Sequence, residues 1–579
     1  MMRPSVWAPD AQQVELVVND GSHQMVAGER GWWLAEQSLP AGATYRFALD
    51  GGEPLADPRA LRLPQGPEGP AGVVDLGAFE WSDADWRGIR LDEAVIYELH
   101  VGTFTDEGTL DAAIERLAHL VELGVGLVEL MPVNSFPGRH GWGYDGVGLW
   151  AVHEPYGGPE ALCRFVDACH ARGLGVCLDV VYNHLGPSGN RLPDFGPYFT
   201  DRYHTPWGQA VNLDGPGSDE VRRFILDNAL GWLRDFHLDA LRLDAVHALY
   251  DERALTLLEQ MSIEVDELAE QLGRRLWLIA ESDRNDPATV TPRDAGGIGL
   301  HAQWADDVHH GLHVLLTGDD QGYYADFAAR EALRTVLEGV FLHDGRWSSF
   351  RGRSHGRPID RTGMPGWRFV VSLQTHDQVG NRATGDRLSA SLDPGVLACG
   401  AALLLTGPAT PMLFMGEEWG ASTPWQYFTD HPDPELAEAV RQGRRREFAD
   451  HGWEPDKVPD PQDPATVERS RLSWQELSEQ PHRRLLQWYR TLIALRREVP
   501  DLRNPCLAEV RVSHDESART VVMERGRYQV VVNLSPQQAH LDLSIAGLQV
   551  AAAWEPDATA VTAREVTLPG RSAAVLSPS

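Results

Sequence analysis

The sequence predicts an α/β protein built around a (β/α)8 TIM barrel, with an N-terminal immunoglobulin-like β-sandwich and a C-terminal antiparallel β-domain. Two observations predict the barrel. Strand-like runs alternate with amphipathic helical runs over most of the chain, and these strands are apolar on both faces, as in buried parallel sheets. Short strands separated by turns at both ends of the chain predict the flanking β-domains. We expect these three parts at residues 1–85, 90–495 and 500–579.

The N-terminal part contains short strands at VELVV (14–18), GWWLAE (31–36) and TYRFAL (44–49). The run LPQGPEGPAG at 63–72 is rich in proline and glycine and marks a loop or boundary. The spacing of these three short strands is typical of a small β-sandwich. The C-terminal runs at 520–535 and 573–577 return to strand patterns and predict the second β-domain.

Strand and helix patterns alternate from Ala94 onward. The number of repeats favours a closed eight-stranded barrel over an open sheet, because open doubly wound domains are usually smaller. The apolar run 396–416 contains internal glycines and prolines, so we expect a buried helix followed by a buried strand rather than a membrane span. The predicted strands are 94–99, 125–133, 174–182, 240–246, 275–281, 367–373 and 409–416, and the predicted helices are 110–124, 159–173 and 219–236.

The composition excludes several classes of partner. The chain has 84 acidic against 51 basic residues, a net charge of −33, so phosphate backbones and anionic membranes would repel it. Its five cysteines form no C-x-x-C pair, which argues against a zinc module or a disulfide framework. The first residues lack a signal-peptide pattern. We therefore expect a cytoplasmic protein with reduced thiols that binds neither nucleic acid nor membranes.

Three predicted barrel strands each end at a carboxylate: Asp244, Glu281 and Asp377. Active sites of such barrels lie beyond the carboxyl ends of the strands. A single buried carboxylate has a structural ion pair or a helix cap as an equally good explanation. Three that converge, with Arg242 beside Asp244 and His376 beside Asp377, favour a catalytic site.

Hydrolysis of a glycosidic bond needs this equipment, namely one carboxylate as nucleophile or base and one carboxylic acid to protonate the leaving oxygen. We expect Arg242 to keep Asp244 ionised through its positive charge. Glu281 has a more apolar setting near other carboxylates, and it should therefore hold its proton.

Four segments carry a family resemblance: DVVYNH (179–184), ALRLDAVH (240–247), AES (280–282) and THDQ (375–378). In this order and at these intervals they closely resemble the signature segments of the α-amylase superfamily of retaining glycoside hydrolases. The resemblance implies that Asp244 is the nucleophile, Glu281 the general acid/base and Asp377 the stabiliser of the transition state.

The same resemblance assigns supporting residues. It implies that Arg242 orients Asp244 and that His184 and His376 hydrogen-bond the sugar in the cleaved subsite. WGYD at 142–145 resembles a further family segment, which implies that Tyr144 lines that subsite and Asp145 helps to hold Arg242. Trp207 is a candidate for stacking on a sugar ring.

Longer segments are similar to one group within the superfamily. The stretches 304–327, 376–388 and 414–448 resemble the maltooligosyltrehalose trehalohydrolases, whereas 6–17 resembles a β-sandwich that this group shares with branching and debranching enzymes. The resemblance implies hydrolysis of the α-1,4 bond next to a terminal trehalose, which releases trehalose and a maltooligosaccharide with retention of configuration and without cofactor or metal. It also implies substrate contacts for Asp306, Asp307, His309 and His310. Further substrate-binding candidates are His247, and Gln378, Asn381 and Arg382, whose loop follows a catalytic strand.

Some assignments stay open. Gln378, Asn381 and Arg382 are candidates to recognise the trehalose end, but a loop-structural role for Asn381 is equally compatible. His309 and His313 have helical spacing, yet without a third ligand sugar binding or helix structure is favoured over a metal. Glu417 and Glu418 suit either sugar contact or a structural ion pair, and the arginines at 444–446 suit a solvated helix face.

Two other functions compete with the trehalose-releasing hydrolase. A glycogen branching enzyme would use the same three carboxylates, although branching enzymes usually have an acidic residue where Gln378 stands. A non-catalytic glucan-binding protein is a different class, and the intact set of Asp244, Glu281 and Asp377 argues against it. We expect saccharides as the partners and a monomer as the default state.

Overall fold

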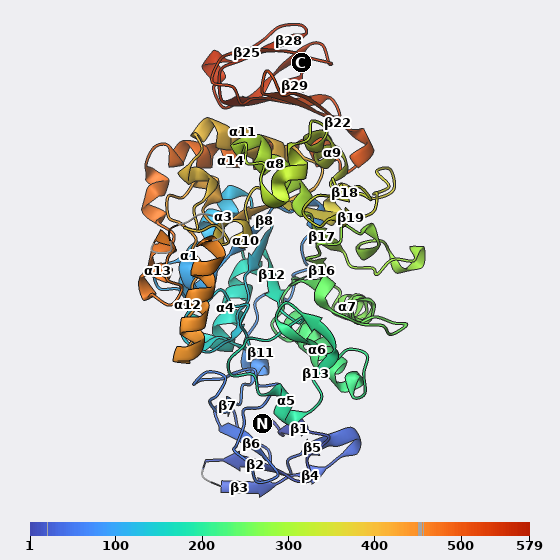
Figure 1. Cartoon of the computed structure of the whole chain (residues 1–579), viewed down its shortest axis with the longest axis vertical. Helices are drawn as coiled ribbons and strands as arrows, with labels where there is room; N and C mark the ends of the chain where they lie inside the picture. Colours follow the sequence, from blue (N-terminus) through green and yellow to red (C-terminus); the bar gives the residue numbers. More distant parts are fainter. Residues whose placement is uncertain (20, 450–453, 455–456) are drawn as a thin grey trace.

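The computed structural model describes residues 1–19, 21–449, 454 and 457–579. Figure 1 shows three regions in a row along the long axis: N-terminal sheets at one end, a barrel in the middle and C-terminal sheets at the other end. The expected boundaries at 85–90 and 495–500 stay predictions.

The central region is a closed barrel of eight strands in which every neighbouring pair is parallel. This confirms the closed barrel over an open sheet. The strands are β8 (Ile96–Leu99), β9 (Leu127–Leu130), β12 (Gly175–Val180), β15 (Ala240–Leu243), β16 (Trp277–Ala280), β17 (Ala302–Trp304), β20 (Phe369–Ser372) and β21 (Thr410–Phe414).

Seven of these strands lie within the runs expected from the sequence, whereas β17 was not predicted. It has three residues, too few to show a strand pattern before the helix that follows it. The helix expected at 110–124 is divided into α2 (Leu110–Ile114) and α3 (Leu117–Leu123). The apolar run 396–416 is a buried helix and strand, α11 (Pro394–Thr406) followed by β21, as expected.

The barrel interior changes character along its axis. Apolar residues such as Ile96, Leu127 and Cys177 fill the end where the strands begin. Two positions further along the same strands are Glu98, Glu129 and Asp179, all buried, and residues two apart on a strand share a face. Charged groups therefore gather inside the barrel toward the carboxyl ends of its strands.

Two antiparallel sheets form the N-terminal region. One has the order β1 (Ser5–Trp7), β5 (Trp32–Leu34), β4 (Val26–Ala27), and the other has the order β3 (Gly21–Gln24), β2 (Val14–Val18), β6 (Thr44–Leu49), β7 (Ala71–Gly72). Strands β2 and β6 lie where the sequence predicts strands. This region packs on the barrel. Trp7 meets Tyr198 edge-on with ring centroids 5.4 Å apart, and Arg59 pairs with Asp227 at 2.8 Å.

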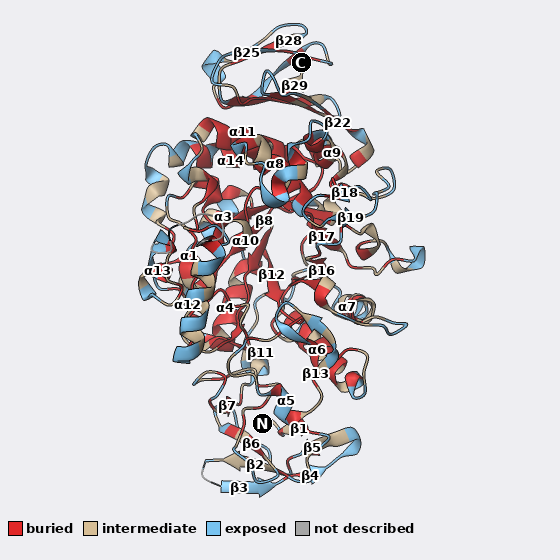
Figure 2. Ribbon diagram, viewed as in Figure 1, coloured by how far each residue is buried: buried red, intermediate tan, exposed pale blue. Residues whose placement is uncertain are grey.

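The C-terminal region has a five-stranded sheet in the order β22 (Val510–Asp515), β23, β24, β29, β26 (Leu548–Ala553). It also has a three-stranded sheet in the order β25 (Ala539–Asp542), β28 (Glu565–Leu568), β27 (Ala560–Val561). Its strands β23 (Thr520–Arg525), β24 (Tyr528–Asn533) and β29 (Ser572–Pro578) match the predicted runs. Figure 2 shows the buried residues concentrated around the barrel strands and in the helices against them. No helix in the described ranges is both long enough and apolar enough to cross a bilayer.

Several elements outside the barrel strands shape its mouth or its outer layer. They are α4 (Gly158–His170), β13 (Phe199–Thr205), β14 (Gly208–Val211), α6 (Ser218–Asp235), α7 (Leu257–Leu272), α8 (Asp306–Thr317), α9 (Ala332–Gly339), β18 (Trp347–Ser348), β19 (Arg353–Ser354), α10 (His376–Gly380), α12 (Pro434–Ala449) and α14 (His482–Glu498).

Candidate active site

Arg242 lies inside the barrel beside the buried carboxyl groups, and its side chain is 1% exposed. Its Nη1 donates to Asp244 Oδ1 at 2.7 Å and to the two oxygens of Asp179 at 2.9 and 2.8 Å, and its Nη2 lies 3.5 Å from Glu281 Oε2. The guanidinium also packs over the Trp304 ring, 4.3 Å from its centroid. One cation thus brings together two of the three predicted carboxylates, although they follow different strands.

Asp244 follows β15 directly and is held from two sides. Asn183, at the exit of β12, donates through Nδ2 to Asp244 Oδ2 at 2.7 Å and to the Asp244 carbonyl at 2.9 Å. The guanidinium of Arg242 occupies the other carboxylate oxygen. These contacts fix the orientation of a carboxylate at the end of its strand.

Glu281 follows β16, and its Oε2 accepts a hydrogen bond from the Ala245 backbone at 2.5 Å. Ala245 has a left-handed conformation with φ of 39°, uncommon for a residue other than glycine, and this conformation lets its N–H reach the carboxyl group. Burial and the nearby charges of Asp244 and Asp377 raise the pKa of Glu281 to about 8, against the lowering effect of Arg242. Glu281 therefore holds a proton at neutral pH, as the sequence predicts.

Asp377 lies at the start of α10, next to His376. Its backbone N–H donates to the Thr375 hydroxyl at 3.2 Å, which caps the helix. His376 Nε2 lies 3.5 Å from Asp377 Oδ1, and the Asp377 side chain is 48% exposed. The third carboxylate is thus the most accessible of the three.

His184 and Tyr144 lie beside the residues that hold Asp244 in place. Tyr144 donates its hydroxyl hydrogen to Asp179 Oδ2 at 2.5 Å, and His184 Nε2 lies 3.1 Å from the Tyr144 carbonyl oxygen. Trp207, in the turn between β13 and β14, stacks on His184 with ring centroids 4.3 Å apart and an angle of 7°. Its indole is 49% exposed, so an aromatic face is available at this side of the mouth.

Asp145 does not hold Arg242, and that expectation is wrong. Its neighbour is His431, whose Nε2 lies 3.8 Å from Asp145 Oδ2. The partner of Arg242 is Asp179 instead, because β12 and β15 pair with these two residues in register. A neighbouring strand therefore supplies the carboxylate that was assigned to a loop.

The four residues predicted at the start of α8 divide into two kinds. Asp306 is exposed, and His310 is partly exposed against Tyr323. Asp307 is buried, and its Oδ2 accepts from the backbone N–H groups of Leu342 at 2.7 Å and His343 at 3.0 Å. Asp307 therefore anchors the chain after α9, and the expectation of a substrate contact is corrected for this residue.

His309 is also occupied within the protein. Its Nδ1 lies 2.8 Å from the Leu373 carbonyl oxygen and its Nε2 lies 3.2 Å from the Tyr324 hydroxyl. Burial lowers its pKa well below the ordinary value. His309 is thus a neutral wall residue rather than one with a free nitrogen for sugar.

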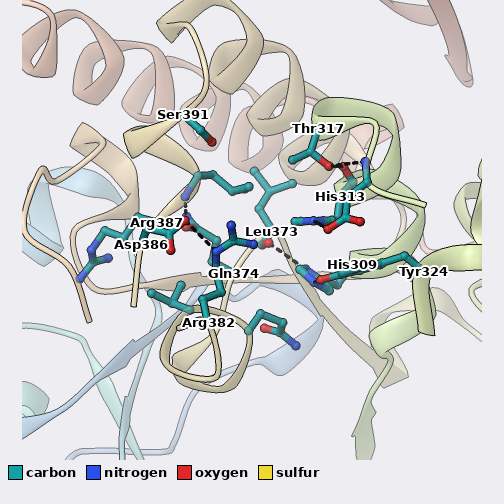
Figure 3. Close-up of a pocket in the computed structure, with 14 residues that line it drawn as sticks. His309, His313, Thr317, Tyr324, Leu373, Gln374, Arg382, Asp386, Arg387 and Ser391 are labelled. Carbon is teal, nitrogen blue, oxygen red and sulfur yellow. Dashed lines mark hydrogen bonds and ion pairs between the residues drawn. The ribbon is translucent and has the colours of Figure 1, made fainter. Parts of the chain in front are cut away.

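A pocket of about 180 Å³ lies between α8 and the loop after Asp377. Figure 3 shows its lining residues, among them His309, His313 and Arg382. Gln378 also lines it, accepting from the Thr375 hydroxyl at 2.5 Å, and Arg382 Nε donates to Asp386 at 2.8 Å. Asn381 does not line this pocket; its amide lies 3.4 Å from Asp377 Oδ1.

His247 belongs to the turn directly after the Asp244 strand. It is partly buried, and its Nδ1 has no hydrogen-bond partner among the described residues. Burial lowers its pKa, although Asp283 opposes this effect. Because this unpartnered nitrogen is itself buried, the predicted sugar contact of His247 stays a prediction.

Sequence reasoning missed an aromatic group on the other side of the mouth. Phe350, in the turn between β18 and β19, is 61% exposed and lies 5.9 Å from the Tyr323 ring. Arg351 ties this turn to Asp283, two residues after Glu281, with a 2.9 Å ion pair. Single aromatics in turns have no periodicity, so only their exposure in the structure reveals them.

Two open assignments are now resolved as structural. Glu418 is buried and lies 2.7 Å from His119 Nε2, while Glu417 accepts from the Tyr489 hydroxyl at 3.1 Å.

The expected solvated face at 444–446 is wrong for Arg444, whose side chain is 9% exposed. Arg444 Nη2 donates to the Gly380 carbonyl at 2.6 Å, so α12 contacts the loop after Asp377.

Within residues 1–19, 21–449, 454 and 457–579, no group of three or more His, Cys, Asp or Glu side chains is arranged to hold a metal ion. The arrangement at the mouth offers general acid–base and nucleophilic chemistry through carboxylates.

Known proteins share this architecture. Residues 78–192 match the family model described as "Alpha amylase, catalytic domain", and residues 505–575 match a domain of unknown function, DUF3459. The crystal structure of a Salmonella typhimurium protein superimposes with a TM-score of 0.91 at 36% identity, covering 99% of this chain and 97% of that one. A pullulanase from Paenibacillus barengoltzii has a TM-score of 0.72 at 18% identity, with 100% and 94% covered, which is a likeness of fold.

Comparison with curated relatives identifies the family more specifically than comparison with solved structures does. A malto-oligosyltrehalose trehalohydrolase from Arthrobacter ramosus is 59% identical over 92% of both chains. One from Rhizobium sp. (strain M-11) is 53% identical over 99% of this chain and 97% of its own length. A 1,4-alpha-glucan branching enzyme from Xanthomonas campestris is 26% identical, over 93% of this chain and 72% of its own.

The barrel, the matched catalytic domain and the carboxylates at its mouth define a glycosidase of the α-amylase superfamily. Within that class the identity to the curated relatives is decisive. The chain belongs to the malto-oligosyltrehalose trehalohydrolase family.

Proposed function

We propose that this enzyme hydrolyses the α-1,4 bond next to the terminal trehalose of maltooligosyltrehalose and releases trehalose and a maltooligosaccharide. One observation carries the chemistry: a single guanidinium, that of Arg242, contacts Asp244 and lies beside a Glu281 that holds its proton. Membership of the trehalohydrolase family supports the choice of substrate.

In the first step Asp244 attacks the anomeric carbon of the sugar in the cleaved subsite. A bond forms between that carbon and an Asp244 oxygen as the glycosidic carbon–oxygen bond breaks, and Glu281 gives its proton to the leaving oxygen. Trehalose leaves with the protonated oxygen as its 4-hydroxyl group. Asp377 and the surrounding negative charge stabilise the positive charge that develops on the sugar ring.

In the second step a water molecule attacks the same carbon. Glu281, now a carboxylate, takes the proton from water, and the bond to Asp244 breaks. Two inversions give retention of configuration. The maltooligosaccharide leaves, and both carboxyl groups return to their starting protonation states.

We assign sugar contacts to accessible groups around these carboxylates. Trp207 lies in the loop that follows β12, and Phe350 lies in the loop that follows β17. Both present exposed aromatic faces, and such faces complement the C–H surfaces of sugars. Gln378 and Arg382 line the pocket behind Asp377 and are our candidates for the trehalose end. The other proposed contacts are Tyr144, His184, His247, Asp306, His310 and His376.

Product analysis tests this function. We expect maltotriosyltrehalose to give trehalose and maltotriose, and plain maltopentaose, a glucose oligomer of the same length, to be attacked more slowly. Equal cleavage of both substrates would reduce the function to a general α-1,4-glucanase. Branched products without free trehalose would instead identify a branching enzyme, and binding without turnover would identify a glucan-binding protein.

We further propose that the enzyme acts as a monomer; size-exclusion chromatography tests this. All five cysteines are unpaired. That state supports a reducing compartment, the cytoplasm, as its location.

A further inference from the structure

Glu98 forms two hydrogen bonds with His376. On β8, Glu98 has a 1% exposed side chain, and its Oε1 accepts from His376 Nδ1 at 2.5 Å. Its Oε2 accepts from the His376 backbone N–H at 3.0 Å. A carboxylate from the first barrel strand therefore fixes both the ring and the backbone of a residue that follows β20.

The rest of the surroundings leave one ring nitrogen for chemistry. Tyr144 stacks on the imidazole with ring centroids 5.0 Å apart and an angle of 23°. Nε2, the nitrogen that Glu98 does not occupy, lies 3.5 Å from Asp377 Oδ1. The ring is thus held edge-on toward the cleaved subsite.

The charges around His376 decide its protonation. Burial lowers its pKa, but the charges of Glu98 and then Asp377 outweigh burial and raise the pKa to about 9, with Arg242 opposing them. The titratable or charged groups that face it from the surrounding elements are Glu98 (β8), Glu129 (β9), Asp179 (β12), Arg242 (β15), Asp377 (α10), His100 and Tyr144.

We propose that Glu98 is a positioning residue that keeps His376 an imidazolium, so that its Nε2–H is presented as a donor to the sugar and to Asp377. A neutral imidazole carries one N–H. If Glu98 held that single hydrogen on Nδ1, Nε2 would be an acceptor and would face Asp377 with like polarity. Only the doubly protonated ring satisfies Glu98 and donates from Nε2 together. The inference rests on the proposed function, because the sugar is the substrate assigned there.

The barrel itself offers a matched control in Glu129. It pairs in register with Glu98 on the adjacent strand and is equally buried, at 1% exposed. Neither of its carboxyl oxygens has a hydrogen-bond partner within the described residues. Burial, Glu98 and Asp179 raise its pKa well above the ordinary value, so it is already a neutral acid. Glutamine in its place changes neither charge nor shape substantially.

The first experiment compares kcat and KM of wild type, E98Q and E129Q on maltotriosyltrehalose between about pH 5 and pH 9. Without the countercharge of Glu98, the buried His376 loses a proton near neutral pH. We expect E98Q to lose about 10- to 100-fold in kcat/KM at about pH 7.5 and to recover part of this loss below about pH 6. E129Q should stay within about 3-fold of wild type throughout.

A double-mutant cycle separates positioning from general damage to the fold. If Glu98 acts through His376, E98Q should cost less than about 2-fold further once H376Q is present. An equal loss from E98Q in both backgrounds, or a loss that is the same at every pH, would overturn the proposal.

A titration of wild type covers the case in which E98Q does not fold. Histidine labelled with ¹³C at Cε1, with H376Q to assign the signal, should show His376 protonated beyond about pH 8. Deprotonation below about pH 7 refutes the inference. Because this titration needs no substrate, failure of wild type to release trehalose would count against the proposed function alone.

Discussion

The two ends of the barrel carry similar residues in opposite electrostatic states. At the base, where the strands begin, Asp83 accepts from His170 Nδ1 at 2.7 Å and from His237 Nδ1 at 2.9 Å. Asp239 accepts from His170 Nε2 at 2.9 Å and from the Trp86 indole at 2.7 Å. Each carboxylate at the base therefore has at least two donors.

At the mouth the carboxyl groups outnumber the positively charged groups. Arg242 is shared among Asp179, Asp244 and Glu281, and Asp377 stands half exposed. The pKa values diverge accordingly: burial tends to raise that of Asp83, but its two histidines lower it far below its ordinary range, whereas burial and like charge raise that of Glu281. Satisfied ion pairs stabilise the fold, and crowded carboxylates prepare a proton for transfer.

The largest expected effect is at the mouth. D244N removes the proposed nucleophile, and kcat on maltotriosyltrehalose should fall by about 10⁴-fold or more, because the covalent intermediate of the proposed mechanism could not form. The matched variant at the base is D83N, which should retain kcat within about 3-fold. The comparison of the two ends fails if D83N loses as much activity as D244N while its circular dichroism spectrum is unchanged.

Glu281 should set the alkaline limit of activity. In the proposed mechanism its proton goes to the leaving group, and its pKa is about 8, so kcat/KM should fall about 10-fold per unit above that pH. The pH profile of wild type measures this limb. A limb centred near pH 5, the range of an ordinary carboxyl group, would show that crowding at the mouth does not raise this pKa.

At the base the expected effect is on stability. D83N leaves His237 and one side of His170 without a carboxylate partner, which should cost about 3 kcal/mol and lower the urea midpoint. The lowered pKa of Asp83 stabilises the fold above the ordinary carboxyl pKa and is lost as pH falls through the lowered value. His170 has a raised pKa, because hydrogen bonds to Asp239 and Asp83 outweigh burial, and its contribution is lost as pH rises through that value.

The difference in urea midpoint between wild type and D83N should therefore be largest between about pH 4 and pH 6.5. A difference that does not vary with pH would mean that Asp83 acts through packing rather than charge. D85N, at an exposed aspartate two residues further on, is the control and should leave the midpoint unchanged.

The mouth was more predictable from sequence than the base, for a physical reason. Parallel strands end at one edge, so Asp244, Glu281 and Asp377 could be placed together from strand patterns alone. The base network joins Asp83, in the segment before the barrel, to histidines at helix ends, and no local pattern announces it. Strand register was equally invisible, which is why Asp145 was assigned the contact that Asp179 makes.

Prediction from sequence is limited in a similar way for residues on helices. The spacing of His309 and His313 indicates a helix but not which face meets the cleft. The structure turns Asp307 and His309 inward, toward backbone groups that come from distant segments. Exposure decides function for such residues, and exposure depends on packing that the sequence pattern does not contain.

The smallest expected effect concerns a support of the mouth that lies outside the barrel. Arg444 on α12 donates to the carbonyls of Gly380 and Arg382 and packs 4.5 Å from the Phe448 ring, so it holds the loop that follows Asp377. R444A should raise KM about 3- to 10-fold with a smaller change in kcat, because the loop loses order while the nucleophile and acid stay in place. R446A, at an exposed arginine of the same helix, is the control. A fall in kcat with KM unchanged would instead place the effect of α12 on Asp377 itself, and the support would then belong to the chemical step rather than to substrate binding.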